Sequence, residues 1–404
     1  MILPPVRDRG SAGIPHASRH EDPAFVLRSA ALYPPRRPFI RAENAPPPGP
    51  RTAQVSIVSC AGYGREVKEA FDRSFDLLGG IGHLVKGRTV TVKINLTGSN
   101  FRATYDRPVG ESYMTHPATV MALTAAFFSA GARRVRLVES TNLRQPLEKT
   151  LVAAGFDLRA FQALGPTEVE DTRNLGHGKA YATLKVPGPG HLFESFDLNH
   201  SYVDTDVFVS LCKLKTHATT GITLTMKNLF GITPNALYGD EAPSEDGLKG
   251  RGRMHDLKGW DTRENPLAFD PPGSKREFFE PNDGGYRIPR ILADLNAARP
   301  IHLGIIDGIT TLNYAEGPWV KGKPQRITSP RVLICGLNPV ATDTVGTAVM
   351  GFANVRGTRG TPPFRPGDNH LLLGEADGLG PCDLTRTEVV GLSIAKARSQ
   401  EFPS

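Results

Sequence analysis

The stretch RTVTVKINL at residues 88–96, with THPATVMALTAAFFSAGA at 115–132 and RRVRLVES at 133–140, decides the fold class. The first and third pieces are short runs of β-branched and aliphatic residues, which are typical of buried strands. The middle piece has helical apolar spacing, and we expect Thr115 to cap that helix and Gly131 to end it. A strand, a helix and another strand in this order predict a βαβ unit with parallel strands.

The same alternation extends in both directions along the chain. Further strands are expected at QVSIVSC (54–60), DVFVSLCKLKTH (206–217), IHLGIIDGI (301–309) and RVLICG (331–336). Further helices are expected at YGREVKEAFDRSFDLLG (63–79) and from Pro339 to Met350. The chain is therefore predicted to be an α/β protein whose mostly parallel sheet has helices on both faces.

Two segments lack this pattern. Residues 1–52 are rich in Pro and Arg, and we expect a disordered arm there, either a solvated tail or a segment that wraps a partner subunit. Residues 236–287 form a long irregular insert, dense in Gly, Pro and charge, which we expect to act as a lid. The folded domain is thus predicted to cover residues 53–404, with the insert inside it.

Composition narrows the classes of function. The 404 residues are 39% hydrophobic and 22% charged, which is the balance of a globular protein. The net charge of +7 suits anionic ligands, but no basic run is interleaved with aromatic residues, so nucleic-acid binding is not expected. No apolar run has the length of a membrane span and no export signal is visible, so we expect a cytoplasmic protein without a membrane partner.

The cysteines argue against one class of cofactor. The four lie far apart, at Cys60, Cys212, Cys335 and Cys382, and none belongs to a CxxC pair. An iron–sulfur cluster is therefore not expected, and the usage suits a reducing compartment. The sequence leaves open a divalent metal, any other cofactor and a homo-oligomeric state.

Polar side chains follow five of the expected strands. They are Lys93 and Asn95, the run from Glu139 to Asn142, the run from Lys213 to His217, Asp307, and Asn338 with Asp343. Ligands of parallel sheets bind beyond the carboxyl ends of the strands. We therefore predict a site at the C-terminal edge of the sheet. His116 lies at a helix start, where a capping role and a place over the site are equal alternatives.

The segment KLKTHATTGITLTMKNLFG, residues 213–231, is the densest part of this site. Side chains alternate along a strand, so Lys213, Lys215 and His217 share a face if the strand stays extended. Thr219-Thr220-Gly221 offers amides and hydroxyls that can receive an anion at a helix start. A lysine in apolar surroundings or near another cation has a lowered pKa and can act as a base, a nucleophile or an imine former. The alternative is that these lysines only balance carboxylates such as Asp307.

The candidate residues fall into three roles. Predicted catalytic residues are Lys227, His217 and Lys215; predicted ligand-binding residues are Lys93, Asn95, His116, Lys213, Thr220 and Asn228; candidate metal ligands are Asp307, Asp343 and His217. The spacing of the metal candidates matches no known ligand motif.

Several of these pieces resemble the DUF362 family, from about residue 54 to 393. The resemblance rests on VKINL (92–96), THPATV (115–120), KLKTH…KNLFG (213–231) and GLNPVATDTVG (336–346). It implies an α/β domain whose reaction is largely unestablished. Many members carry a ferredoxin-like iron–sulfur segment, and this chain lacks the cysteines for one.

A more distant resemblance is to the nickel-pincer lactate racemases. In that family a histidine and a lysine flank a small-residue loop, and the lysine holds the cofactor covalently. His217 and Lys227 are similarly placed around Thr-Gly-Ile-Thr, but Asn228-Leu229-Phe230-Gly231 departs from the Pro-Gly of that family. The resemblance implies a related sheet, and the cofactor is not carried over.

Together these observations favour an enzyme that acts on a small anionic metabolite, a carboxylate or a phosphate. Lys213 and Lys215 would pair with the anion, and His217 or Lys227 would move a proton. Two alternatives stay open: a non-catalytic protein that binds a metabolite or a metal in the same crevice, and an accessory protein that docks a partner through its basic arm.

Overall fold

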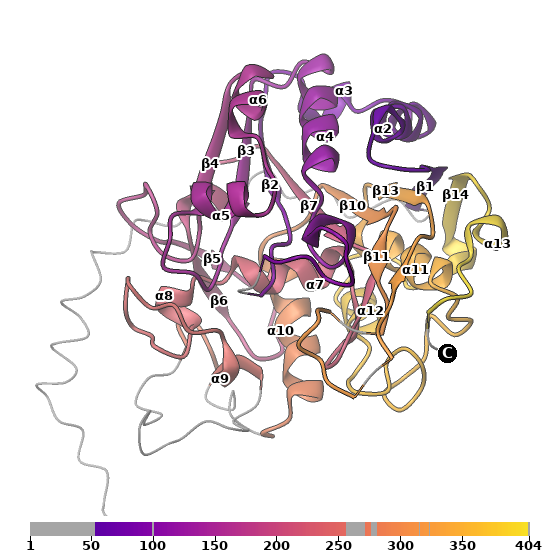
Figure 1. The fold of residues 1–404 in the computed structure, drawn as a ribbon. Helices are drawn as coiled ribbons and strands as arrows, with labels where there is room; N and C mark the ends of the chain where they lie inside the picture. The colour runs from indigo at the N-terminus through magenta and orange to yellow at the C-terminus, as the bar shows by residue number, and fades with distance from the viewer. Residues whose placement is uncertain are drawn as a thin grey trace, which may run out of the picture. The chain divides into compact units, whose positions relative to one another are not determined.

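An eight-stranded sheet runs through the described part of the chain (Figure 1), in the order β14-β1-β13-β10-β7-β2-β3-β4. The computed structural model describes residues 53–98, 101–255, 271–275, 281–314, 316–322 and 324–402. The predicted arm lies outside these residues, as do 256–270 and 276–280 of the predicted lid, so both remain predictions.

The bounds of the elements are as follows. The sheet consists of β1 (Ala53–Ser59), β2 (Thr89–Lys93), β3 (Arg134–Glu139), β4 (Thr167–Asp171), β7 (Val207–Lys213), β10 (Leu303–Gly308), β13 (Val332–Gly336) and β14 (Thr387–Gly391). Short pairs are β5 (Ala182–Lys185) with β6 (Ser195–Leu198), β8 (Lys215–His217) with β9 (Gly221–Thr223), and β11 (Thr311–Leu312) with β12 (Ile327–Thr328). The helices are α2 (Arg65–Leu77), α3 (Gly82–Val85), α4 (Pro117–Ser129), α5 (Leu147–Ala153), α6 (Leu158–Ala163), α7 (Thr225–Asn228), α8 (Asn235–Tyr238), α9 (Gly252–His255), α10 (Gly284–Ala298), α11 (Pro339–Val349), α12 (His370–Ala376) and α13 (Ile394–Ala397).

The α/β class and the mostly parallel sheet are confirmed, with one strand as an exception. β7 pairs in parallel with β2 and β10, and β3 pairs in parallel with β2 and β4. β13, however, is antiparallel to both β1 and β10, and Gly336 at its end lies opposite Gly304. The carboxyl end of β13 is therefore at the opposite edge of the sheet. The prediction that this strand delivers Asn338 to the same edge as the others is wrong, because an apolar run does not encode strand direction.

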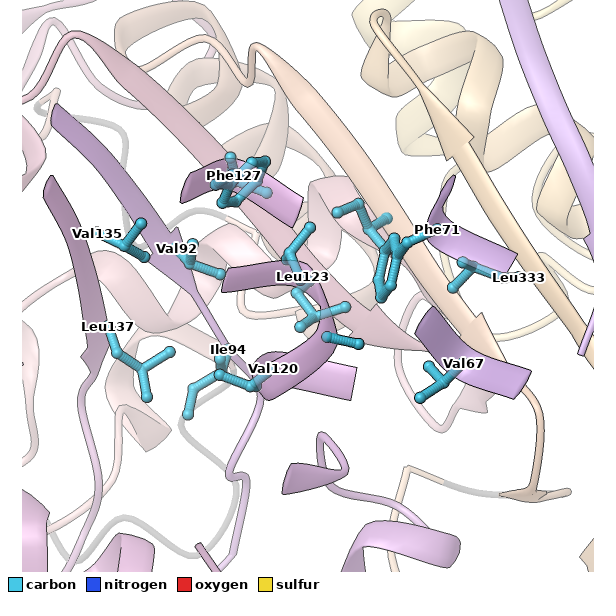
Figure 2. Packing of buried hydrophobic residues seen from close by; sticks show 14 of the residues in the cluster. Val67, Phe71, Val92, Ile94, Val120, Leu123, Phe127, Val135, Leu137 and Leu333 are labelled. Atoms are coloured by element: carbon cyan, nitrogen blue, oxygen red, sulfur yellow. The ribbon is translucent and has the colours of Figure 1, made fainter. Parts of the chain in front are cut away.

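Side chains alternate between two hydrophobic layers, one on each face of the sheet. Along β10, Leu303 and Ile305 belong to the layer under α2 and α4, whereas Ile306 belongs to the layer under α11. Figure 2 shows the first layer, in which Phe71 of α2 and Phe127 of α4 pack above the strands. We call these the α2/α4 face and the α11 face. Burial on both faces explains why the central strands are continuous apolar runs.

The start of α4 differs from the prediction. His116, and not Thr115, caps the helix, since its Nδ1 accepts a hydrogen bond from the amide of Ala118 at 3.0 Å. Thr115 Oγ1 instead accepts a hydrogen bond from the amide of Asn95 at 2.8 Å. Thr115 therefore ties the end of β2 to the helix start, a contact that local sequence does not reveal.

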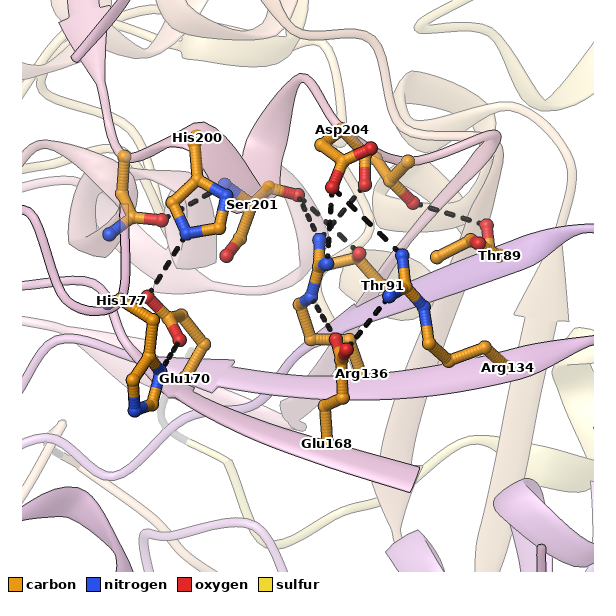
Figure 3. Close-up of polar contacts among 12 residues, drawn as sticks. Thr89, Thr91, Arg134, Arg136, Glu168, Glu170, His177, His200, Ser201 and Asp204 are labelled. Carbon is orange, nitrogen blue, oxygen red and sulfur yellow. Dashed lines mark hydrogen bonds and ion pairs between the residues drawn. The ribbon is translucent and has the colours of Figure 1, made fainter. Parts of the chain in front are cut away.

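A polar cluster binds the 177–204 segment to the edge of the sheet (Figure 3). Arg136 of β3 is buried between Glu168, at 2.6 Å, and Asp204, at 3.4 Å. On the next strand, Glu170 accepts hydrogen bonds from His177 and His200. The side chains of Arg136, Glu168 and Glu170 point away from the α2/α4 face, and these contacts give each charge a partner.

Among the described residues, no helix combines the length and the apolar character that crossing a membrane requires.

Candidate functional site

A polar pocket of about 110 Å³ opens beyond the carboxyl ends of β2 and β3. A volume of this size holds several waters or a small metabolite. Six of the predicted catalytic and ligand-binding residues line it: Lys93, Asn95, Lys215, His217, Lys227 and Asn228. Their side chains come from β2, β8 and α7, which are far apart in sequence.

Lys93 forms the charged floor of the pocket with Glu139. Its Nζ lies 2.5 Å from Glu139 Oε1, and both side chains are almost fully buried. The amides of Leu96 and Ser140 donate to the same carboxylate, at 2.6 and 2.8 Å. Glu139 therefore accepts hydrogen bonds from the Lys93 ammonium and from two backbone amides. Burial lowers the pKa of Lys93, and the ion pair with Glu139 opposes that effect. This pair is a structural element of the site.

Asn95 and Asn228 connect the floor to Lys215. Asn95 Nδ2 donates to Asn228 Oδ1 at 3.0 Å, and Asn95 Oδ1 accepts from Lys215 Nζ at 3.2 Å. Lys215 Nζ also donates to the carbonyl oxygens of Tyr113 at 2.7 Å and Glu316 at 3.0 Å. All three N–H bonds of Lys215 are therefore used. Burial lowers its pKa to about 7, whereas three oxygen acceptors around Nζ favour the ammonium form.

Asp343 positions the helix that carries Lys227. Its Oδ1 accepts hydrogen bonds from the amide and hydroxyl of Thr225, at 2.8 and 2.6 Å, and its Oδ2 accepts from the amide of Met226 at 2.8 Å. An anion thus does lie at a helix start, but it is the protein's own carboxylate. Burial raises the pKa of Asp343 to about 7 against the effect of these donors.

Lys227 is the cation of the pocket that lacks a partner among the described residues. Its side chain is 9% exposed, and its ammonium makes neither a hydrogen bond nor an ion pair there. The Nζ lies 4.7 Å from the centre of the Phe230 ring, which is a cation–π distance. Burial is the main reason that the pKa of Lys227 falls from 10.5 to about 8, and nearby Arg251 adds to the effect.

His217 is held as a neutral ring. Its Nδ1 accepts hydrogen bonds from the amides of Thr219 and Thr220, at 3.0 and 3.3 Å. The remaining proton of the neutral imidazole is therefore on Nε2, which makes that nitrogen a donor. Burial, followed by the charge of Lys227, lowers the pKa of His217 well below its usual 6.5.

Arg251, Glu316 and Thr223 also line the pocket, although none of them was predicted to be a catalytic, ligand-binding or metal-binding residue. Arg251 donates to Ser140 Oγ at 2.8 Å and to the carbonyl oxygen of Thr233 at 2.8 Å. Glu316 Oε2 accepts from the amide of Ala218 at 3.0 Å. Thr223 lines the pocket with a buried hydroxyl that has no partner among the described residues. Arg251 lies in the irregular insert, where no local pattern distinguishes it from the other charges.

Lys213 does not reach the pocket. It continues the alternation of β7 and lies on the α2/α4 face, where its Nζ donates to Asp307 at 3.0 Å and to Tyr63 at 2.6 Å. Thr119 donates to the same carboxylate at 3.0 Å, and the Tyr63 ring stacks on His116 at 3.6 Å. Lys213 therefore matches the alternative prediction, in which a lysine of this segment only balances a carboxylate such as Asp307. The premise that it shares a continuous strand with Lys215 is wrong, because the chain leaves β7 at Leu214.

The other predicted residues are also separated from the pocket. Thr220 Oγ1 donates to the carbonyl oxygen of Ile222 at 3.0 Å and does not line the pocket. The candidate metal ligands Asp307, Asp343 and His217 have no common partner. In the part of the chain that the structure describes, no group of three or more His, Cys, Asp or Glu side chains is arranged to hold a metal ion.

Fold and pocket together define an α/β protein with a buried, lysine-centred polar site. The chain belongs to the family described as "Domain of unknown function (DUF362)", whose sequence profile matches residues 90–348. No curated protein matches the chain.

Two solved structures show a distant likeness. The lactate racemase apoprotein from Thermoanaerobacterium thermosaccharolyticum is 13% identical with a TM-score of 0.34, over 65% of this chain and 50% of that one. A Thermotoga maritima protein is 12% identical with a TM-score of 0.33, over 70% of this chain and 57% of that one. The chain thus spans about half the length of these relatives, and neither likeness bears on its chemistry.

Proposed function

We propose that the pocket binds a small anionic metabolite, a carboxylate or a phosphate, and that the protein is an enzyme acting on it. The observation that carries this proposal is Lys227, a residue 9% exposed whose ammonium has no hydrogen-bond or ion-pair partner among the described residues. A buried charge without a counterion costs several kcal/mol, so proteins rarely retain one without a use for it. A bound anion would supply the counterion.

The surrounding charges support an anionic ligand. Lys215 and Arg251 donate only to carbonyl, amide and hydroxyl oxygens, and neither forms an ion pair with a described residue. Four cationic side chains line the pocket, against the carboxylates of Glu139 and Glu316 among the described residues. Because Glu139 is fully engaged by Lys93 and backbone amides, the cations above it attract a further negative charge.

Two buried hydroxyl groups of the pocket also support an anionic ligand. The hydroxyl groups of Thr141 and Thr223 line the pocket and are buried without a partner among the described residues. Buried polar groups in proteins are almost always hydrogen-bonded, to protein, water or ligand. Oxygen atoms of a carboxylate or phosphate accept from such hydroxyls and from ammonium groups at once.

The titration of the lysines favours an enzyme over a purely passive binder. Lys227, with a pKa of about 8, exchanges a proton near neutral pH, which is what a general acid or base requires. His217 presents a neutral donor beside it. A site that only attracted anions would gain from lysines that keep their usual pKa.

Anion binding by the wild type and two variants tests the proposal. Thermal-shift and calorimetric titrations would use small carboxylates and inorganic phosphate, with the wild type, Lys227→Met and Lys68→Met. Lys68 is the matched control because its side chain is 60% exposed on the surface. We expect at least one anion to bind the wild type and the Lys68 variant, and Lys227→Met to bind it at least about tenfold more weakly. Equal affinity in all three proteins, or no binding at all, would contradict the proposal.

A further inference from the structure

We propose that Lys227 is a nucleophile that forms an imine with a small carboxylic acid bearing an aldehyde or ketone group. The inference rests on the proposed function and narrows it to a substrate class, the oxo acids. It follows from the different hydrogen bonding of the lysines that line the pocket.

Two of the three lysines that line the pocket are held in place by hydrogen bonds or an ion pair. Lys215 Nζ uses all three of its N–H bonds on Asn95, Tyr113 and Glu316. Lys93 Nζ pairs with Glu139 and also donates to the carbonyl oxygen of Ile94 at 2.6 Å. To attack a carbonyl carbon, either amine would have to lose its proton and break these bonds. Both therefore suit electrostatic roles.

Lys227 differs from them in its hydrogen bonding. Its amine breaks no hydrogen bond when it moves onto a ligand, because it makes none with the described residues. Its Nζ lies over the face of the Phe230 ring, 4.7 Å from the ring centre. Its pKa of about 8 leaves roughly a tenth of the amine neutral at pH 7. Desolvation and nearby cations are the means by which imine-forming lysines are activated.

The neighbours of Lys227 define what the electrophile carries. Lys215 and Arg251 are cations without a carboxylate partner, so they suit the carboxylate of a ligand. Lys227 then faces another part of the same small molecule. On a carboxylic acid that also bears an aldehyde or ketone group, the carbon of that second group is the one with which a neutral amine reacts reversibly. The pocket volume of about 110 Å³ restricts such acids to a few carbon atoms.

The step is balanced without an oxidant or a reductant. The lone pair of the Lys227 amine forms the C–N bond as the π bond of the carbonyl breaks, and one proton passes from the nitrogen to the oxygen to give a carbinolamine. The hydroxyl then takes a second proton and departs as water while the nitrogen lone pair forms the C=N bond, and loss of the remaining N–H proton leaves the neutral imine. One water is released for each imine. The Nε2–H of His217 can hydrogen-bond the departing oxygen, since its Nδ1 is occupied by backbone amides.

Reductive trapping tests the inference. The intact wild type would be treated with sodium cyanoborohydride and glyoxylate, pyruvate or acetoacetate in turn, and analysed by intact mass and peptide mapping. The variants Lys227→Arg and Lys68→Arg keep a positive charge at each position, and Lys68 of the wild type serves as an exposed internal reference. We expect one adduct on Lys227 with at least one of these acids. It should persist in Lys68→Arg, disappear in Lys227→Arg and exceed any labelling of Lys68 in the wild type.

The failure of this inference is distinct from the failure of the proposed function. Propionate, which lacks the carbonyl of pyruvate, is titrated beside it by thermal shift. If anions stabilise the wild type but no adduct forms on Lys227, or if labelling is spread evenly over exposed lysines, the imine is overturned and anion binding stands. If neither stabilisation nor an adduct is seen, both proposals are overturned.

Discussion

Replacing Lys227 with Met should make the ligand-free protein more stable. Met keeps most of the stem and removes the charge that has no partner. The fall in pKa from 10.5 to about 8 corresponds to a penalty of about 3 kcal/mol on the charged, folded form. The cation–π contact with Phe230, at 4.7 Å, offsets about 1 kcal/mol of this. We therefore expect the free energy of unfolding to rise by about 2 kcal/mol at pH 7.

The sign of the pH dependence follows from the same values. The folded protein holds Lys227 at a lower pKa than the unfolded chain does, so the unfolded chain binds more protons between about pH 8 and pH 10.5. The penalty is complete below pH 8 and disappears as the pH rises towards 10.5. The advantage of Lys227→Met should accordingly shrink to about 1 kcal/mol at about pH 9.

Urea or guanidinium titrations at pH 7 and about pH 9 measure both effects. The exposed control Lys68→Met should change the free energy of unfolding by less than about 0.5 kcal/mol at either pH. A Lys227→Met variant that is less stable than the wild type would refute the reasoning. So would an advantage that does not decline with pH, because the penalty would then not come from a buried ammonium.

Four further substitutions have definite expected outcomes. Asp343→Asn should lower the free energy of unfolding by about 1–3 kcal/mol in denaturant titrations, because its new NH2 group faces the donors of Thr225 and Met226; an unchanged midpoint would show that the carboxylate does not anchor α7. Lys93→Met and Glu139→Gln should each lower the free energy of unfolding by roughly 3–5 kcal/mol, because each leaves a buried charge without its partner. The double variant should lose clearly less than the sum of the two single variants. Strict additivity in this double-mutant cycle would show that Lys93 and Glu139 are not coupled. His116→Ala should cost about 1 kcal/mol through loss of the α4 cap and leave anion affinity in calorimetry unaltered; a marked loss of affinity would restore His116 to the site.

The strands of the sheet interior could be predicted because burial on both faces leaves a strong signal. β2, β7 and β10 are rich in aliphatic and β-branched residues, and all their positions are buried. The edge strands β4 and β14 have mixed burial and polar residues, and the sequence did not distinguish them from loops. The antiparallel direction of β13 depends on the path of the chain between strands, and the periodicity of apolar residues does not indicate that path.

The candidate site was predictable where it depends on the parallel strands. Lys93 and Asn95 reach the pocket because they end a strand of the expected direction. The prediction that Lys213 binds the ligand with Lys215 is wrong, because the strand ends at Lys213 and this side chain lies on the α2/α4 face, paired with Asp307. The repeated Lys-x-Lys-x-His pattern does not indicate this break at Leu214. Arg251 was missed because its place in the pocket is set by tertiary contacts of the insert with Ser140 and Thr233.

The most direct test of the central claim is the pKa of Lys227 itself, measured by nuclear magnetic resonance of isotope-labelled lysine. Lys227→Arg would assign the signal, and the titration would be repeated with a saturating anion found in the binding screen. We predict a midpoint at about 8 in the free protein, and a higher midpoint once the anion supplies the missing counterion. A midpoint near the ordinary value of 10.5 in the free protein, or one that no bound anion raises, would contradict the account.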